Sequence, residues 1–167
     1  MVSLPIPPPD MVDQRSANGV VVNICKRQLK FQRLSPHAVL PRYAHEGDAG
    51  LDLSAAIDTE IIIPAGSRLR IPTGWAVEIP IGLEGQVRGR SSMNAKGLLV
   101  PLGTIDAGYR GEISVVLLNL SGEPKWIHPS DRIAQLVIAP VVHVVPEVVD
   151  ELEPSERGTG GYGSTGR

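Results

Sequence analysis

The chain has 167 residues and a mass of 17.8 kDa, a length that suits one domain with its own core and excludes two full-sized domains. Lys and Arg number 16 against 18 Asp and Glu, a net charge of -2, so no overall basic field favours polymeric nucleic acid or an anionic membrane. Hydrophobic residues make up 42% and Gly and Pro number 18 and 15, which excludes disorder throughout and predicts many turns and few long helices.

The first 19 residues are rich in proline and polar residues, and we expect a flexible arm over 1–19. This stretch lacks the cationic start and apolar core of a signal peptide, and its prolines oppose an amphipathic targeting helix. Cys25 is the only cysteine, which excludes an intramolecular disulfide and a cysteine-based zinc site. We therefore expect a reducing, cytoplasmic setting.

Short β-branched segments recur between turn signals over residues 20–150 and predict one all-β domain, a sandwich, jelly roll or barrel. In chain order they are VVNI, LKFQRL, LDLSAAI, TEIIIP, SRLRIP, GWAVEIP, EGQVRG, GEISVVLLNL, KWIH, DRIAQLVIAP and VVHVV. Only Ser91–Gly97 has room for a short helix, which Gly97 would close.

The end of the chain differs from the rest in composition. The most apolar long stretch, Ile133–Val149, is interrupted by Gln135, His143, Glu147 and two prolines, so we expect no membrane span. From Arg157 the sequence RGTGGYGSTGR is almost free of aliphatic residues and cannot pack a core. We expect a second flexible arm over 151–167.

Three stretches combine arginine with Gly, Ser or Thr: Gly89–Met93, Thr104–Glu112 and Arg157–Gly166. Guanidinium groups bind phosphate oxygens bidentately, and small residues let backbone amides approach an anion closely. Each stretch taken singly also fits a structural role, as a helix cap or a solvated linker. Together they indicate a phosphate-bearing ligand.

Several single residues have both a functional and a structural interpretation. Asp106 stands between the apolar Ile105 and a tight turn at Ala107 and Gly108, where it either presents a carboxylate or bonds its own backbone. Tyr109 fits a sugar or base platform as well as strand-edge packing, and Tyr162 among glycines is either idle or stacks on a flat ligand. Asp48 and Asp52 frame a glycine turn and either help hold a hydrated magnesium ion or serve that turn.

Read in order, DAGLDLSA, GRSSM, GTIDAGYRGEI, SDRIAQLVI and RGTGGYGSTG resemble the five motifs of the trimeric deoxyuridine triphosphatase (dUTPase) family, over roughly Lys30 to Gly166. The resemblance implies a jelly-roll-like β subunit with one short helix and a homotrimer whose active sites draw motifs from all three subunits. The C-terminal motif would close over substrate as an arm. The implied activity is Mg²⁺-dependent hydrolysis of dUTP to dUMP and pyrophosphate, which keeps uracil out of DNA and supplies dUMP for dTMP synthesis.

The resemblance also implies residue roles. Asp106 matches the aspartate that orients and deprotonates the attacking water, and Tyr109 the tyrosine whose ring leaves no room for a 2′-hydroxyl. Asp52 would hold magnesium indirectly, through water. The phosphate-binding positions are Arg90, Ser91, Ser92, Gln135, Arg157, Gly160, Gly161, Gly163, Ser164 and Thr165. The uracil- and deoxyribose-binding positions are Gly103, Thr104, Ile105, Tyr109 and Tyr162.

The sequence departs from the family pattern in a few places. Gly97 to Leu102 runs straight into Gly103 without the Asn that several relatives use in uracil recognition. Ser92 and Ser130 stand where Gly is common, and Tyr162 stands where Phe is usual. Ser92 and Ser130 are small and Tyr162 is similar to Phe, so we expect these three to change little. The missing Asn bears on the selectivity for the base.

Two rival functions remain open at this point. The dCTP deaminases resemble dUTPases but carry a catalytic glutamate about ten residues beyond the motif aspartate, where this chain has Val116, so a proton shuttle for attack at a base carbon is missing. A non-catalytic nucleotide sensor is the second rival. Asp106 and the arginine-containing motifs are intact, and the sequence gives no reason to prefer it.

Overall fold

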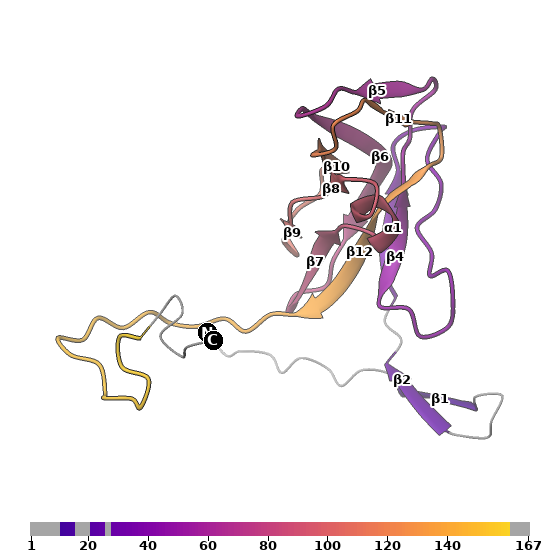
Figure 1. Ribbon diagram of the computed structural model, residues 1–167. Coiled ribbons are helices and arrows are strands. Elements are labelled where there is room, and N and C mark those ends of the chain that lie inside the picture. Colours follow the sequence, from indigo (N-terminus) through magenta and orange to yellow (C-terminus); the bar gives the residue numbers. More distant parts are fainter. Residues whose placement is uncertain (1–10, 16–20, 26–27, 161–167) are drawn as a thin grey trace.

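A computed structural model describes residues 11–15, 21–25 and 28–160 (Figure 1). Its main body is built from two four-stranded antiparallel sheets. The first sheet has the order β3 (Lys30–Arg33), β6 (Arg68–Glu78), β10 (Glu112–Asn119) and β8 (Leu98–Leu99). The second has the order β4 (Gly50–Ser54), β12 (Arg132–Pro140), β7 (Leu83–Arg88) and β9 (Gly103–Ile105). Two smaller pairs join β11 (Lys125–Ile127) to β5 (Ile61–Ile63) and β1 (Met11–Arg15) to β2 (Val21–Cys25).

One hydrophobic core joins the two large sheets. Alternate residues of β10 are buried, among them Ile113, Val115 and Leu117, as expected where successive side chains point to opposite faces. They pack in one cluster with residues of the other sheet such as Leu53 and Leu136. Such alternation is the pattern that predicts a strand with one face on the core, although β6 buries residues on both faces over 73–77.

Strand β6 is longer than the sequence predicts. Ser67–Pro72 and Gly74–Pro80 were expected as two strands, since Pro and Gly usually end them, but one strand of 11 residues runs through both. Gly74 has φ +72°, and its N–H donates to the Glu112 Oε1 at 2.8 Å. A register shift in the pairing with β10 lies opposite, between Glu112 and Ser114. The strand therefore bends at Gly74 without ending.

The predicted short helix is confirmed as α1 (Ser91–Asn94). Gly97 has φ +78°, and its N–H donates to the Asn94 carbonyl at 2.9 Å, which closes the helix. The short strands β8 and β9 were not expected from the sequence. Strand β1 was not expected either, because it lies inside the stretch 1–19 predicted as a flexible arm. It pairs with β2, which lies outside that stretch, so the sequence of the arm alone does not reveal the strand.

The predicted strand VVHVV is wrong. Residues 141–149 follow β12 without regular structure and leave the body (Figure 1), with Val142, Val144 and Val145 exposed. β-Branched residues favour a strand only where a neighbour completes its hydrogen bonds, and the described chain offers none here. Residues 151–160 continue the segment, with turns between Ser155 and Gly160. The division at 19 and 150 stays a prediction, and among the described residues no helix is long and apolar enough to cross a membrane.

Candidate active site

A cavity of about 340 Å³ lies beside the turn that follows β9. Its walls come from the stretch before β9, from β9 itself and from the start of β10. Asp106, Tyr109 and Glu112 supply its polar atoms, and residues such as Val100 and Ile113 its apolar wall. The sequence-predicted uracil and deoxyribose positions Gly103, Thr104, Ile105 and Tyr109 therefore line one cavity together with Asp106.

Strand β9 fixes the position of Asp106. It pairs antiparallel with β7 and buries Ile105, so the next residue stands at the strand end. The Tyr109 N–H donates to the Asp106 carbonyl at 3.0 Å and closes a tight turn. The Asp106 side chain itself is exposed and has no hydrogen bond or ion pair with the part of the chain that the structure describes. Its carboxylate is thus available to a ligand or a water molecule.

Tyr109 forms one wall of the cavity. Its Oη donates to the Glu112 carbonyl at 3.1 Å, and its ring lies across Gly111, where a Cβ would overlap the phenol. Arg110 steadies the same turn, because its Nη1 donates to the carbonyls of Ala107 and Tyr109, both at 2.7 Å. Tyr109 is therefore an exposed residue whose hydroxyl bonds the first residue of β10 while its ring lines the cavity, a position compatible with both the platform and the strand-edge interpretation.

A second group of predicted residues meets on β4, β7 and β12, around Asp52. The Arg90 Nε contacts Asp52 Oδ1 and the Arg132 Nη1 contacts Asp52 Oδ2, both at 2.9 Å. The Arg90 Nη1 also donates to the Arg132 carbonyl at 2.9 Å. The Asp52 and Arg90 side chains are only 14% and 22% exposed, so their pair lies in a partly desolvated setting, where such pairs are strong. The Arg132 side chain is 54% exposed, and its pair with Asp52 is the more solvated of the two.

Gln135 and the serines of α1 lie close to this group. The Gln135 Nε2 donates to the Gly89 carbonyl at 3.1 Å, and Gln135 stands opposite both Asp52 and Arg88 in the sheet register. A Cβ on Gly50 would lie 2.5 Å from its Oε1, so the absence of a side chain at Gly50 leaves room for the amide in this position. Ser91 and Ser92 follow Arg90 directly, and both are exposed. The predicted phosphate positions Arg90, Ser91, Ser92 and Gln135 are thereby brought together.

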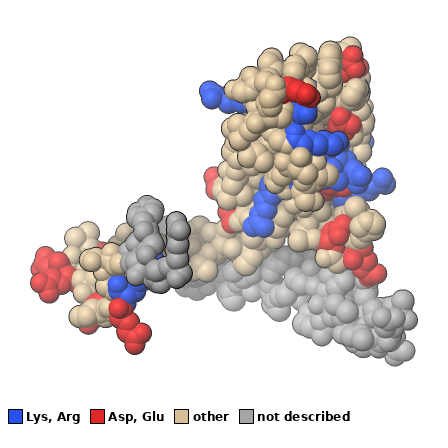
Figure 2. Space-filling model, viewed as in Figure 1, with Lys and Arg blue, Asp and Glu red and all other residues tan. Residues whose placement is uncertain are grey.

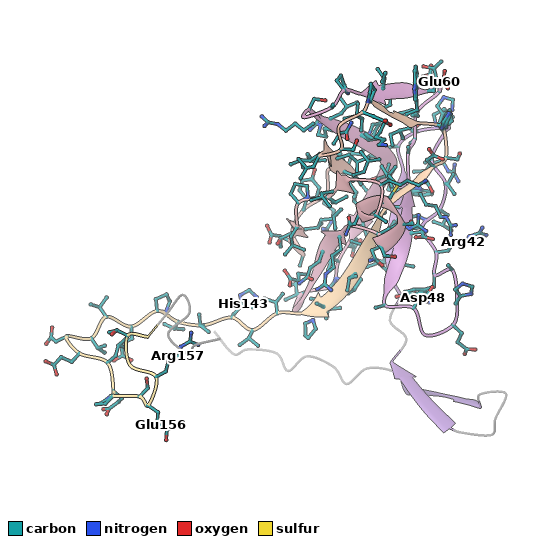
Figure 3. The ribbon with its side chains drawn as sticks, viewed as in Figure 1. Arg42, Asp48, Glu60, His143, Glu156 and Arg157 are labelled. Carbon is teal, nitrogen blue, oxygen red and sulfur yellow. The ribbon has the colours of Figure 1, made fainter. Side chains whose placement is uncertain are left out.

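The two groups do not meet within one chain. None of the described residues that line the Asp106 cavity is Lys or Arg, and Arg90 and Ser92 line a different groove. Arg157 and Gly160 lie on the segment that leaves the body (Figure 3), where the Arg157 Nε donates to the Gly160 carbonyl at 2.9 Å. The predicted positions Gly161, Tyr162, Gly163, Ser164 and Thr165 lie outside the described residues.

Sequence reasoning assigned no role to two residues that the site uses. Arg132 supplies the second guanidinium group on Asp52. Its place at the start of the strand that also carries Gln135 is a sequence signal that could have identified it. Glu112 fixes Tyr109 through its carbonyl and the β6 bend through its carboxylate. No sequence signal identifies Glu112, because its partners are distant in the chain or bind its backbone.

The two aspartates that could hold magnesium have other partners. Asp48 accepts the His45 N–H at 2.8 Å through Oδ2, which supports the turn interpretation. Both Asp52 oxygens face arginines. Across residues 28–160 and the two described N-terminal strands, no three His, Cys, Asp or Glu side chains gather as a metal site. Magnesium would have to be held mainly by a ligand's own oxygens and by water.

The family model described as dUTPase matches residues 37–166. The chain belongs to the dUTPase family. A deoxyuridine 5'-triphosphate nucleotidohydrolase of Syntrophotalea carbinolica is 46% identical over 141 residues, covering 83% of this chain and 96% of the relative. One from Desulfotalea psychrophila is 52% identical over 130 residues, covering 76% and 87%.

Solved dUTPase structures share the fold. A Staphylococcus bacteriophage 80alpha dUTPase mutant with dUpNHpp superposes with a TM-score of 0.79 at 29% identity, covering 85% of this chain and all of that one. A phage phi11 dUTPase mutant, described as revealing the coordination of a structural Mg(II) ion, has a TM-score of 0.69 at 28% identity and covers 75% and 98%. The predicted jelly-roll-like all-β fold and the resemblance to dUTPases are confirmed.

Proposed function

We propose that the chain hydrolyses dUTP to dUMP and pyrophosphate. The observation that carries the proposal is the Asp106 carboxylate, which has no partner among the described residues and lies at a cavity walled by the Tyr109 ring and the β9 backbone. Relatives named as deoxyuridine 5'-triphosphate nucleotidohydrolases support it, with coverage of nearly their whole length. The proposal includes a cytoplasmic location, which the single cysteine favours, and the removal of dUTP from DNA synthesis.

Asp106 orients a water molecule and takes its proton. The water oxygen attacks the α-phosphorus in line, the bond to the oxygen bridging the α- and β-phosphorus breaks, and pyrophosphate leaves. Phosphoryl-type transfers need little covalent chemistry from the protein, so the rate depends on positioning and on charge stabilisation. In the part of the chain that the structure describes, the Asp106 carboxylate has no competing partner, which supports this role.

Selection of uracil and deoxyribose falls to β9 and Tyr109. In the described part of the chain β9 is the edge strand of its sheet, so its outer backbone groups at Gly103, Thr104 and Ile105 can bond the uracil edge. Backbone groups that match uracil are left unpaired by cytosine, which disfavours dCTP. The Tyr109 ring packs against deoxyribose and excludes a 2′-hydroxyl.

The phosphates bind to groups from the Asp52 cluster and from the C-terminal arm. Arg90, Ser91, Ser92 and Gln135 contact phosphate oxygens, with Asp52 and Arg132 fixing the Arg90 guanidinium. From the arm, the phosphate contacts are Arg157, Gly160, Gly161, Gly163, Ser164 and Thr165, and Tyr162 stacks on uracil. A closing arm excludes water from the site while ligand is bound.

The site requires more than one copy of the chain. The Asp106 cavity offers a triphosphate two carboxylates and, of the described residues, no Lys or Arg. Arg90 and Arg157 stand on other parts of the chain. A homotrimer in which each site takes Asp106 and Tyr109 from one subunit, Arg90 from the next and the arm from the third would supply the missing cations.

Magnesium fits this site as a companion of the triphosphate. The donor set around Asp52 has no spare carboxylate oxygen for direct coordination, since both face arginines, so Asp52 would act at most through water. When bound, the ion neutralises charge on the phosphates. The residues of the chain bind and orient the substrate around it.

The test is pyrophosphate release with magnesium from dUTP, dTTP, dCTP and UTP in parallel. Strong preference for dUTP supports the proposal and shows that the stretch before Gly103 forms a selective pocket without the Asn. Broad hydrolysis overturns the specificity. Binding of dUTP without pyrophosphate release favours the nucleotide sensor, and uridine nucleotides formed from dCTP would favour a deaminase.

A further inference from the structure

A cationic groove of about 380 Å³ lies between α1 and β11. Its lining includes Arg90, Arg132, Lys96, Lys125 and Trp126. The Trp126 side chain belongs to the exposed hydrophobic residues of the chain, at 53% exposure. An exposed indole that lines the same groove as two lysines is an unusual surface, because large aromatic residues are normally buried more completely.

The two lysines of this groove are held less tightly than its arginines. Arg90 and Arg132 are both held by Asp52. Lys96 is exposed and makes no ion pair with the described residues. The Lys125 side chain is 28% exposed, and its Nζ forms a long ion pair of 4.0 Å with the exposed carboxylate of Glu123, a contact that a docked carboxylate can replace. The one acidic residue of the lining, Asp131, has its Oδ2 2.8 Å from the His128 N–H, which donates to it. The groove therefore retains a net positive charge beside an apolar ring.

The opposite charge is found on the C-terminal segment. Residues 150–156, DELEPSE, carry four carboxylates, those of Asp150, Glu151, Glu153 and Glu156. The stretch from 141 to 156 contains no Lys or Arg, and none of the four forms an ion pair within the described chain. Figure 2 shows acidic side chains gathered on this segment, away from the body. Leu152, between them, is 87% exposed.

We propose that residues 150–156 of one copy dock in the Lys96–Lys125–Trp126 groove of a second copy. The two lysines pair with carboxylates of the segment, and Leu152 covers the Trp126 ring. This inference rests on the proposed multi-subunit site, and it adds an anchor for the arm that does not require nucleotide. Nothing in the phosphate-binding role of the arm by itself calls for acidic residues.

Position in the chain and in space support a second copy as the partner. The groove lies at the Arg132 end of β12 and the segment departs from the Pro140 end, so roughly 25–30 Å separate them along this nine-residue strand. The segment then runs away from its own body (Figure 1). Arg157 follows the acidic stretch directly, and Arg90 lines the groove, so docking brings both arginines to one place.

Tryptophan fluorescence gives a direct readout. The chain has two tryptophans, and Trp75 is only 5% exposed, so acrylamide quenching without nucleotide reports mainly on Trp126. The test variant is the full chain with a neutralised segment (Asp150→Asn, Glu151→Gln, Glu153→Gln, Glu156→Gln). Its ratio of docked to free arms should fall by about tenfold, since each exposed ion pair that is lost lowers the docking equilibrium constant by a few-fold. Quenching should rise to match, and 1 M salt should do the same to the unaltered chain.

The identity of the partner copy is tested by mixing. The neutralised chain is coexpressed with a chain that carries Trp126→Phe and an acidic segment, so every Trp126 signal comes from a chain that cannot dock its own arm. Protection of Trp126 in the mixed trimers supports the proposal. Protection only in the unaltered homotrimer means that each arm docks on its own subunit and overturns it, as does equal quenching of unaltered and neutralised chains.

Charge exchange separates this inference from the proposed function. Lys96→Glu with Lys125→Glu should lose the Trp126 protection, and adding Glu151→Lys with Glu153→Lys should restore it. Failure of that rescue overturns the docking even if dUTP hydrolysis is normal. An inactive protein that retains the charge-dependent protection would instead overturn the proposed function and leave the docking intact.

Discussion

The Tyr109 hydroxyl donates to the backbone carbonyl of Glu112 at 3.1 Å and so draws the phenol ring over Gly111. The ring is held at its two ends, by the turn at Asp106 and by the start of β10. An exposed aromatic side chain usually samples several rotamers, whereas this one forms a rigid wall. Rigidity is what a steric filter for a 2′-hydroxyl requires.

Gly111→Ala should reduce the preference for dUTP over UTP by about tenfold, because its Cβ would overlap the Tyr109 phenol and displace the ring. The measurement is kcat/KM for both nucleotides. Gly108→Ala is the matched control in the same turn, since a Cβ there meets nothing within 4 Å. Equal selectivity in the two variants would contradict the role of Tyr109 as a fixed filter.

Asp106→Asn should lower kcat by a factor of about 10²–10⁴, the usual contribution of a positioned general base, while the affinity for dUTP changes little. The amide keeps the shape of the side chain but cannot take the proton of the water. Single-turnover pyrophosphate release and calorimetric titration with a non-hydrolysable analogue measure the two quantities. Asp58→Asn, at an exposed turn outside the cavity, is the control, and a near-normal rate in Asp106→Asn would remove the assigned role.

The sequence predicts the fold class well because each strand carries its own alternating pattern, as β10 does. It fails where structure depends on a distant partner. The bend at Gly74 requires Glu112 across the sheet, and VVHVV has strand composition but no described neighbour to pair with. Pro72 and Gly74 look like strand ends until that partner is known.

The residues of the candidate site likewise fall into those that one local motif predicts together and those that only the folded sheet brings together. Asp106 and Tyr109 stand in one short motif, and they do line one cavity. Arg90, Asp52 and Gln135 come from three motifs and meet only through the register of β4, β12 and β7. The Asp52–Arg132 pair joins residues 80 positions apart. The glycine turn and the family resemblance predict an indirect magnesium role for Asp52, and neither reveals that both of its oxygens contact arginines.

Asp52→Asn should raise KM for dUTP by about tenfold with a smaller change in kcat, because Arg90 loses the carboxylate that orients it. Arg132→Gln should act in the same direction, and the double variant should be little worse than either one, since both disturb one cluster. The magnesium concentration for half-maximal rate should stay unchanged in Arg132→Gln. A shift in that concentration confined to Asp52→Asn would instead favour a direct metal role for Asp52.

Gly74→Ala should destabilise the fold more than Gly66→Ala does. Both glycines have positive φ, +72° and +70°, so both variants carry a similar backbone strain of about 1 kcal/mol. A Cβ at Gly66 meets nothing within 4 Å, whereas one at Gly74 would lie 2.6 Å from the Ala38 Cβ and 2.9 Å from the Ser35 Cβ. That overpacking should add about 1–3 kcal/mol, read as the difference in unfolding free energy from denaturant titrations. Equal losses would mean that the loop containing Ala38 shifts freely, and the bend in β6 would then depend on the left-handed backbone of Gly74 alone.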